Sequence, residues 1–213
     1  MILLKKQLFI ISAILIFNIN VFAQKKVACI GDSITFGARI ENREENSYPA
    51  QLQNLLGNEW LVENFGNSGS TLLKKGNKPY WNQKEFNNAI NANPDIVIIK
   101  LGTNDTKPDN IKFKKEFVDN YVELINIFKE LPSKPKIYIC LPVPAFPGNF
   151  KITNKVLVSK IIPRIKKIAK KTKVDLIDLY TPLKNDAAMF PDKIHPNKEG
   201  AAKIADIIAK QLL

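Results

Sequence analysis

Two kinds of hydrophobic pattern alternate along this chain of 213 residues. Short, nearly continuous apolar runs predict strands over residues 26–31, 60–65, 95–101, 136–141 and 174–179. Apolar side chains at three- and four-residue spacing, together with helix start and stop signals, predict helices over residues 48–56, 84–92, 112–131, 156–171 and 199–213, with Pro163 beginning or interrupting the fourth. Apolar strands that alternate with helices are typical of a parallel sheet covered on both faces. We therefore expect a three-layer α/β/α domain with a five-stranded parallel sheet, of flavodoxin-like character.

The N-terminal segment has a different pattern. Two lysines precede an uncharged, mainly apolar run over residues 7–23, which ends in Val-Phe-Ala. This layout is typical of a secretory signal peptide that is cleaved after Ala23, and a retained membrane anchor is the alternative. Because the run is short and contains two asparagines, we favour removal. The sequence thus predicts a signal peptide at residues 1–23, a single domain at residues 24–213, export to the periplasm or the cell exterior, and no stable membrane insertion after cleavage.

The chain is strongly basic, with a formal net charge of +12. Its lysines are spread over the predicted helices, notably at residues 112–115 and 166–171, where they indicate solvated helix faces. No ladder of aromatic and arginine side chains and no nucleic-acid motif accompanies them, so we expect no nucleic-acid partner. An acidic glycan or cell-wall polymer remains compatible with the charge.

The two cysteines each end an apolar strand pattern. An exported protein could pair Cys29 with Cys140 in a disulfide, but we favour two buried thiols that act as small hydrophobic groups. Two cysteines and a single histidine make a zinc site improbable. We expect no metal and no other cofactor.

Polar segments follow the predicted strands, at the positions where sheets of this kind place their sites. Ligands bind beyond the carboxyl ends of the strands in open α/β sheets. The segments after the first four strands lie at residues 31–33, 66–69, 102–105 and 142–144, and the loop before the last helix holds Asp192 and His195. We expect them to meet at one edge of the domain.

Ser33 is the candidate nucleophile. It follows a strand through Gly31, which permits a sharp turn, and it precedes a segment that could open a helix whose terminal amides favour negative charge. A serine hydroxyl needs a base to take its proton, and His195 is the one histidine of the chain. Asp192 lies three residues earlier, so a turn can bring its carboxylate to the imidazole and fix the tautomer.

Acyl transfer also needs donors for the oxyanion that forms in the transition state. Gly69 has no side chain, so its amide can approach an oxyanion closely, and Asn104 offers a neutral side-chain amide. Each also has a simpler interpretation, Gly69 as a turn glycine and Asn104 as a loop cap. Their occurrence together with Ser33 and His195 favours the catalytic interpretation.

These segments occur in one order along nearly the whole mature chain, and in this respect the sequence resembles the SGNH (GDSL-like) hydrolase family. The matching segments are Gly31-Asp32-Ser33, Asn64 to Gly69, Gly102-Thr103-Asn104-Asp105 and Asp192 to Pro196. The resemblance implies the SGNH hydrolase fold, with Ser33 as nucleophile, His195 as base and Asp192 as the residue that orients it. It also implies an oxyanion hole made by the amides of Ser33 and Gly69 and the side chain of Asn104. We find no departure from the family pattern at these positions.

The substrate is less constrained. The sequence is similar to small exported bacterial esterases that remove acetyl groups from sugars, including sialate and xylan acetylesterases. Segments near the expected active edge supply the candidate substrate contacts Tyr80, Trp81, Val143 and Phe146. The aromatic rings among them could stack on a sugar or could simply pack their loops. Because there is no long apolar segment to cover a lipid-binding face, we expect a serine esterase for short-chain, acetyl esters of a carbohydrate, acting through an acyl-enzyme.

Three other interpretations stay open. A lysophospholipase or thioesterase would act on longer acyl chains, and a non-catalytic glycan-binding module would keep the fold without turnover. A metal-dependent phosphatase or nuclease would need clustered acidic and histidine ligands, and one histidine is present. The sequence does not indicate the oligomeric state.

Overall fold

The computed structural model describes residues 23–148 and 150–213. The predicted signal peptide, residues 1–23, lies outside the described residues except for its last position. The described part contains one five-stranded sheet in which every pairing is parallel, in the order β2-β1-β3-β4-β5. Its strands are β1 (Lys25–Gly31), β2 (Trp60–Gly66), β3 (Ile96–Lys100), β4 (Lys136–Leu141) and β5 (Asp175–Asp178). The predicted strands and the predicted three-layer fold are thus confirmed.

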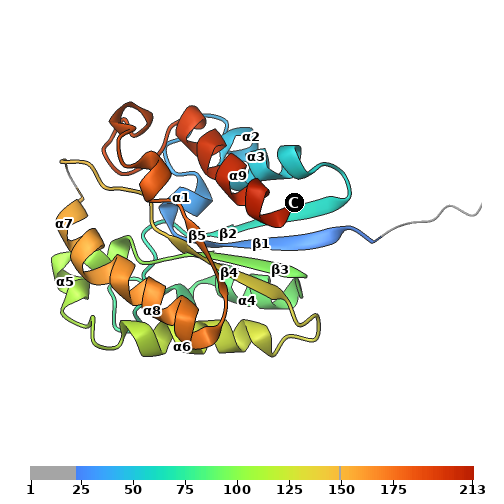
Figure 1. Cartoon of the computed structure of the whole chain (residues 1–213), viewed down its shortest axis with the longest axis horizontal. Coiled ribbons are helices and arrows are strands. Elements are labelled where there is room, and N and C mark those ends of the chain that lie inside the picture. Colours follow the sequence, from blue (N-terminus) through green and yellow to red (C-terminus); the bar gives the residue numbers. More distant parts are fainter. Residues whose placement is uncertain (1–22, 149) are drawn as a thin grey trace, which may run out of the picture.

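Helices cover both faces of this sheet (Figure 1). One face carries α3 (Tyr48–Leu56) and α9 (Lys198–Leu212), and the other carries α4 (Lys84–Asn91), α6 (Phe117–Lys129) and α8 (Ile162–Thr172). Alternate side chains of each strand enter opposite cores, as in β3, where Val97 and Ile99 face α6 and Ile96 and Ile98 face α9. This is why the buried strands read as continuous apolar runs in the sequence.

Two predicted helices differ in the structure. The predicted helix at residues 112–131 begins later than expected: residues 112–116 form tight turns that follow α5 (Pro108–Ile111), and the helix itself, α6, spans Phe117–Lys129. The predicted helix at residues 156–171 becomes α7 (Asn154–Val156), a π-helical segment at Leu157–Ile161, and α8. Pro163 has no N–H to donate, and just before it the Ile162 N–H reaches back five residues to the Leu157 carbonyl.

Cys29 and Cys140 are free and fully buried, in agreement with the prediction of two buried thiols. Burial raises the pKa of the Cys140 thiol to about 12 and raises that of Cys29 further. Both therefore remain protonated and pack as small hydrophobic groups.

No helix among residues 23–148 and 150–213 combines the length and the apolar character that crossing a membrane requires.

Candidate active site

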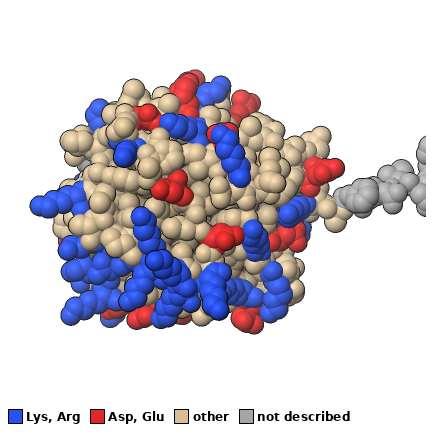
Figure 2. Space-filling view, in the orientation of Figure 1, with Lys and Arg blue, Asp and Glu red and all other residues tan. Residues whose placement is uncertain are grey.

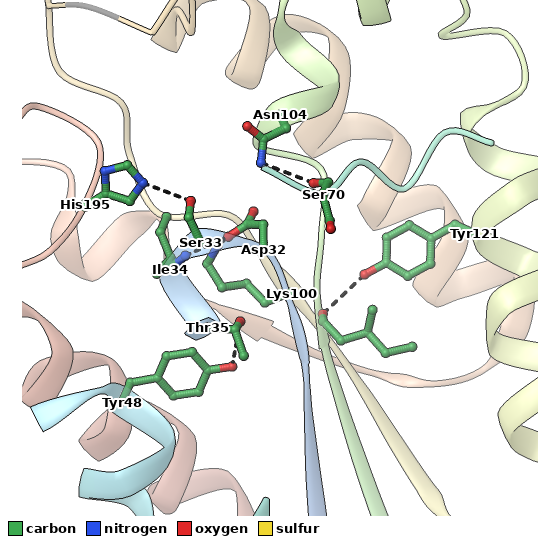
Figure 3. A network of polar contacts seen from close by, with 11 residues as sticks. Asp32, Ser33, Ile34, Thr35, Tyr48, Ser70, Lys100, Asn104, Tyr121 and His195 are labelled. Atoms are coloured by element: carbon green, nitrogen blue, oxygen red, sulfur yellow. Dashed lines mark hydrogen bonds and ion pairs between the residues drawn. The ribbon is translucent and has the colours of Figure 1, made fainter. Parts of the chain in front are cut away.

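The carboxyl ends of the parallel strands bring the polar loops together at one edge of the sheet. Ser33 begins α1 (Ser33–Phe36) directly after β1, and Asn104 begins the 3-10 turn η2 (Asn104–Thr106) after β3. His195 lies in the loop before α9, and Figure 3 shows its ring next to the Ser33 hydroxyl with Asn104 facing the same space. The predicted convergence of these loops is therefore what the structure shows.

The turn that presents Ser33 is shaped by its neighbours. A Cβ atom on Gly31 would collide with the side chain of Thr35, so the strand can pass this closely under α1 only with glycine there. Asp32 caps α1, and its Oδ1 accepts the Ile34 N–H at 3.0 Å. The Ser33 side chain thereby leaves a rigid turn toward the imidazole.

Ser33, His195 and Asp192 form a continuous line of hydrogen bonds. The Nε2 atom of His195 lies 2.8 Å from the Ser33 Oγ, and its Nδ1 lies 2.7 Å from the Asp192 Oδ2. The other carboxylate oxygen of Asp192, Oδ1, accepts the backbone N–H groups of His195 at 2.7 Å and Ile194 at 3.0 Å. This arrangement can pass the serine proton to an imidazole that is held in one orientation.

The carboxylate of this line is held in its charged form. Partial burial by itself would raise the pKa of Asp192, but the His195 backbone N–H, the His195 ring and the Ile194 N–H together lower the pKa below its ordinary value. A carboxylate that stays ionised can stabilise the imidazolium that forms when His195 takes a proton.

A pocket of about 290 Å³ opens in front of the serine hydroxyl. Polar groups from several loops and a few apolar side chains line this pocket. The lining residues are Ser33, Ala38, Ser68, Gly69, Thr103, Asn104, Lys107, Phe150, Ile152, Ile194 and His195. The predicted nucleophile, base and oxyanion donors therefore share one cavity. Asp192 lies behind His195 and is not among its lining residues.

Two of the three expected oxyanion donors, Gly69 and Asn104, are fixed by their loops. Gly69 has a φ of +82°, in the left-handed region that favours glycine. The Asn104 side chain is buried, and its Nδ2 donates one hydrogen to the Ser70 carbonyl at 3.1 Å. Because a carboxamide nitrogen carries two hydrogens, the second can serve a ligand in the pocket.

Asp105 joins these two loops, a contact that the sequence reasoning missed. Its two carboxylate oxygens accept the N–H groups of Leu72 at 3.0 Å and Leu73 at 2.8 Å. Complete burial outweighs these bonds and raises the pKa of Asp105 to about 7. The sequence did offer a signal for this contact: Asp105 is an acidic residue directly after Asn104, and the predicted acyl transfer gives it no role.

Lys100 and Asp32 form a buried ion pair below the serine, which sequence reasoning also missed. The Lys100 Nζ lies 3.2 Å from the Asp32 Oδ1, and the two side chains are 1% and 0% exposed. The available signal was Lys100 itself, which follows four apolar strand residues. Because an unpaired buried lysine is costly, its position indicates a buried acidic partner. Arg39 was missed as well, and its Nε lies 3.3 Å from the Asp192 Oδ2.

The four predicted substrate contacts do not line the catalytic pocket as the structure describes it. For Tyr80 and Val143 the prediction is wrong, because their side chains are 0% and 1% exposed and belong to the two cores. Tyr80 donates its hydroxyl hydrogen to the Phe65 carbonyl at 2.7 Å, so its polar end is satisfied internally. Trp81 donates to the Leu72 carbonyl, and Phe146 packs on Phe190 with ring centroids 5.2 Å apart, so loop packing accounts for both.

Within residues 23–148 and 150–213, no group of three or more histidine, cysteine, aspartate and glutamate side chains is placed to hold a metal ion.

Comparison with known proteins decides the family. The sequence profile of the GDSL-like lipase/acylhydrolase family matches residues 29–203, which include Ser33, Gly69, Asn104, Asp192 and His195. The chain belongs to this family. The match runs from β1 into α9 and so covers most of the described fold of this GDSL-like family member.

Individual relatives agree with this assignment. An acetylxylan esterase of Xylanibacter ruminicola is 41% identical over 202 residues, which is 86% of this chain and 42% of the relative. The chain thus spans less than half the length of that curated relative.

Two solved structures share the fold of this family member. A carbohydrate acetylesterase from Sinorhizobium meliloti has a TM-score of 0.70 and 20% identity, with 89% of this chain and 98% of that chain covered. The aryl esterase of M. smegmatis has a TM-score of 0.69 and 19% identity, with 88% and 98% covered.

Proposed function

We propose that this protein is a serine esterase that removes acetyl groups from a carbohydrate through an acyl-enzyme. One observation carries the proposal: the Ser33 hydroxyl, 2.8 Å from the His195 Nε2, faces a small pocket that the oxyanion donors share. A nucleophile, an oriented base and preorganised donors around one cavity are the requirements for acyl transfer.

The proposed reaction begins at the ester carbonyl. His195 takes the proton of Ser33 as the Oγ attacks the carbonyl carbon, while Asp192 stabilises the imidazolium. The negative charge that develops on the carbonyl oxygen is stabilised by the amides of Ser33 and Gly69 and by the free hydrogen of the Asn104 side chain. Collapse of the tetrahedral intermediate expels the alcohol, which receives the proton from His195.

Water then releases the acyl group. His195 takes a proton from the water as its oxygen attacks the acyl-enzyme carbonyl, and the same donors stabilise the second tetrahedral intermediate. Collapse of this intermediate returns the proton to the Ser33 Oγ and frees acetate. Every proton passes through one imidazole, which fits a pocket lined by a single histidine.

The size and lining of the pocket support a short acyl group. Its volume of about 290 Å³ is at the lower limit of ordinary ligand sites. Ala38, Ile152 and Ile194 supply the apolar lining that an acetyl methyl group needs. The acetylxylan esterase relative supports a carbohydrate as the alcohol, since it is 41% identical over most of this chain.

We also propose that residues 1–23 direct export and are then removed. The basic start, the short apolar run and the small residue at position 23 support this, because together they are typical of secretory signals. N-terminal sequencing of the protein from culture supernatant or periplasm tests it, with Gln24 as the expected first residue.

Substitution of the nucleophile tests the activity. We expect the wild-type protein to release acetate from acetylated xylan and to hydrolyse aryl acetate faster than aryl octanoate. Ser33→Ala, which removes only the hydroxyl oxygen, is expected to lower kcat at least about 10⁴-fold. Full activity of this variant would contradict the mechanism, and a marked preference for octanoate would favour the lysophospholipase or thioesterase interpretation.

A further inference from the structure

The excess positive charge of the chain comes from one region. The sequence between Glu130 and Asp175 contains eleven basic residues and no acidic residue. The positive charge of this stretch nearly equals the formal net charge of the whole chain, +12. The basic residues are Lys134, Lys136, Lys151, Lys155, Lys160, Arg164, Lys166, Lys167, Lys170, Lys171 and Lys173. Sequence analysis indicated solvated lysines spread over the helices, but Figure 2 shows many basic side chains gathered on one side, over the position of α8 and the adjoining part of α6 in Figure 1.

A groove of about 490 Å³ runs between α6 and α8 in this region. Five cations line it, together with one carboxylate and two apolar side chains: Lys114, Lys115, Arg164, Lys167, Lys171, Asp119, Val118 and Pro163. Within the described part of the chain, none of these five cations is within ion-pair distance of an acidic side chain. The groove therefore presents a positive field that the protein does not neutralise.

The guanidinium group in this groove is held in place. Arg164 donates from Nε to the Lys114 carbonyl at 3.2 Å and from Nη1 to the Lys160 carbonyl at 2.7 Å. Both acceptors are neutral, so the full charge of Arg164 remains for an anion in the groove. A fixed guanidinium loses less side-chain freedom on binding than a free lysine does.

Chain connectivity and element packing limit the separation between the groove and the catalytic pocket. Lys107 lines that pocket and Lys114 lines the groove, and the seven residue-to-residue steps from one to the other limit the distance between their Cα atoms to about 25 Å. The π-helical segment that leads into α8 also packs against η2, which carries Asn104. A chain-like ligand in the groove can thus extend toward the serine.

We propose that this groove binds an acidic polysaccharide, a glycan with carboxylates along its chain, which also carries the ester that Ser33 cleaves. This inference rests on the proposed esterase function, because that function supplies a polymer that must reach the pocket. Carboxylates spaced along a sugar chain match the row of cations on α8.

Two other polyanions fit the groove less well. Single-stranded nucleic acids are bound by aromatic side chains that stack on bases, and the lining of the groove includes none. An anionic membrane would be bound by lysines beside exposed large apolar groups, and the apolar lining here is Val118 and Pro163.

Binding is tested with the full mature chain carrying Ser33→Ala, which keeps the polymer intact. Polygalacturonate is the acidic probe and dextran the neutral one. The groove variant adds Lys115→Glu, Lys167→Glu and Lys171→Glu, all exposed positions. The matched control adds Lys84→Glu, Lys184→Glu and Lys198→Glu, which are equally exposed, change the charge by the same amount and lie outside the groove.

We expect the unmodified groove to bind polygalacturonate and not dextran, with affinity that falls as NaCl rises because salt screens the charges. The groove variant should lose at least about tenfold in affinity, and the control should lose less than about twofold. With Ser33 restored, the groove variant should hydrolyse aryl acetate at the wild-type rate and show a raised KM on acetylated polygalacturonate.

Equal binding by the groove variant and the control would overturn the inference. So would tighter binding of single-stranded DNA or of phosphatidylserine vesicles than of polygalacturonate, because each would identify another class of ligand. A failure of the proposed function would give a different result. Ester hydrolysis would then survive Ser33→Ala, while the groove variant would still bind polygalacturonate more weakly than the control.

Discussion

The Nζ atom of Lys100 lies 3.2 Å from the Oδ1 atom of Asp32, and the two side chains are 1% and 0% exposed. The pair joins the carboxyl ends of β1 and β3 directly below the serine turn (Figure 3). The same Oδ1 accepts the Ile34 N–H, whereas Oδ2 has no hydrogen-bond partner among the described residues. Lys100 is therefore the cation that balances a buried carboxylate adjacent to Ser33.

Removal of this cation should destabilise the fold. Lys100→Met leaves Asp32 as an uncompensated buried charge, which costs about 3–5 kcal/mol in comparable pairs. We expect this loss in the free energy of unfolding, measured by urea titration. Adding Asp32→Asn to Lys100→Met should recover part of the loss, because the remaining side chain is then neutral.

Lys136 offers a matched control for this experiment. It is also a strand lysine paired with an aspartate, Asp175, but both side chains are about 60% exposed. Lys136→Met should leave stability nearly unchanged, since exposed ion pairs contribute little. Equal effects of the Lys100 and Lys136 substitutions would show that the buried pair does not stabilise the serine turn.

Asn104→Ala tests the oxyanion hole. Loss of one preorganised donor lowers kcat by about 100- to 1000-fold in serine hydrolases, because the donor acts on charge that develops in the transition state. KM for aryl acetate should change little, since the Asn104 side chain contributes little to binding of the ground-state ester. Steady-state kinetics on aryl acetate give both values.

Asn110 is the control for a merely structural effect in this loop. Its side chain is buried and donates to the Asn104 carbonyl at 2.8 Å and to the Asn77 side chain at 2.9 Å. Both Asn110→Ala and Asn104→Ala should lower the thermal midpoint, the latter through the lost Ser70 contact. The kcat of Asn110→Ala should fall much less than that of Asn104→Ala. A similar fall in kcat for both variants would assign Asn104 to loop structure alone.

The sequence was informative wherever a local pattern determines the structure. The apolar runs located the strands, and parallel strands necessarily bring their carboxyl ends to one edge, so the sequence alone places Ser33 and Asn104 together. The pairing of Asp192 with His195 followed from three-residue spacing within a turn. These features depend on neighbours in the chain or on the direction of the strands.

The features that were missed depend on contacts between distant segments. Tyr80 reads as a loop aromatic, yet its burial is set by Phe65 and by the cluster around Phe86 and Phe128. The break before α6 follows from Asn110, whose hydrogen bonds to η2 and Asn77 fix α5 in place. Helical periodicity continues through that break, so the sequence pattern alone cannot locate it.

Asp105 should make stability depend on pH with a negative slope. The pKa of its carboxyl is about 7 in the folded state and near ~4 in the unfolded state. Folding therefore favours the protonated form of Asp105. The folded protein therefore binds more protons between these values, and this contribution to stability falls as pH rises, by up to about 1.4 kcal/mol per pH unit. It is fully present below pH ~4 and is lost by pH ~7.

Asp105→Asn isolates this contribution. The neutral amide loses one of the two backbone bonds, at a cost of about 1–3 kcal/mol that does not vary with pH. The stability advantage of the wild type over the variant should therefore shrink from pH 4.5 to pH 7.5 in urea titrations. Asp109→Asn, at an exposed position, should show no such trend, and a constant difference for Asp105→Asn would contradict the assignment.

Arg39 should make a small contribution to the position of the acid limb in the activity profile. Its Nε lies 3.3 Å from the same Asp192 Oδ2 that His195 Nδ1 contacts, and its guanidinium covers the Phe150 ring, which packs edge-on against the His195 ring. A cation here opposes a second positive charge on the imidazole. Because Arg39→Gln removes a positive charge beside this hydrogen-bonded line, the acid limb of kcat/KM should move to higher pH in this variant.

The expected displacement is at most about half a pH unit, because the Arg39 side chain is 62% exposed and solvent screens it. Arg39→Lys keeps the charge and should retain the wild-type limb, which separates charge from packing on Phe150. High salt should bring the Arg39→Gln and wild-type profiles together. Identical limbs at low salt would show that solvent screens the Arg39 charge completely, and equal displacement in both variants would assign the effect to packing instead.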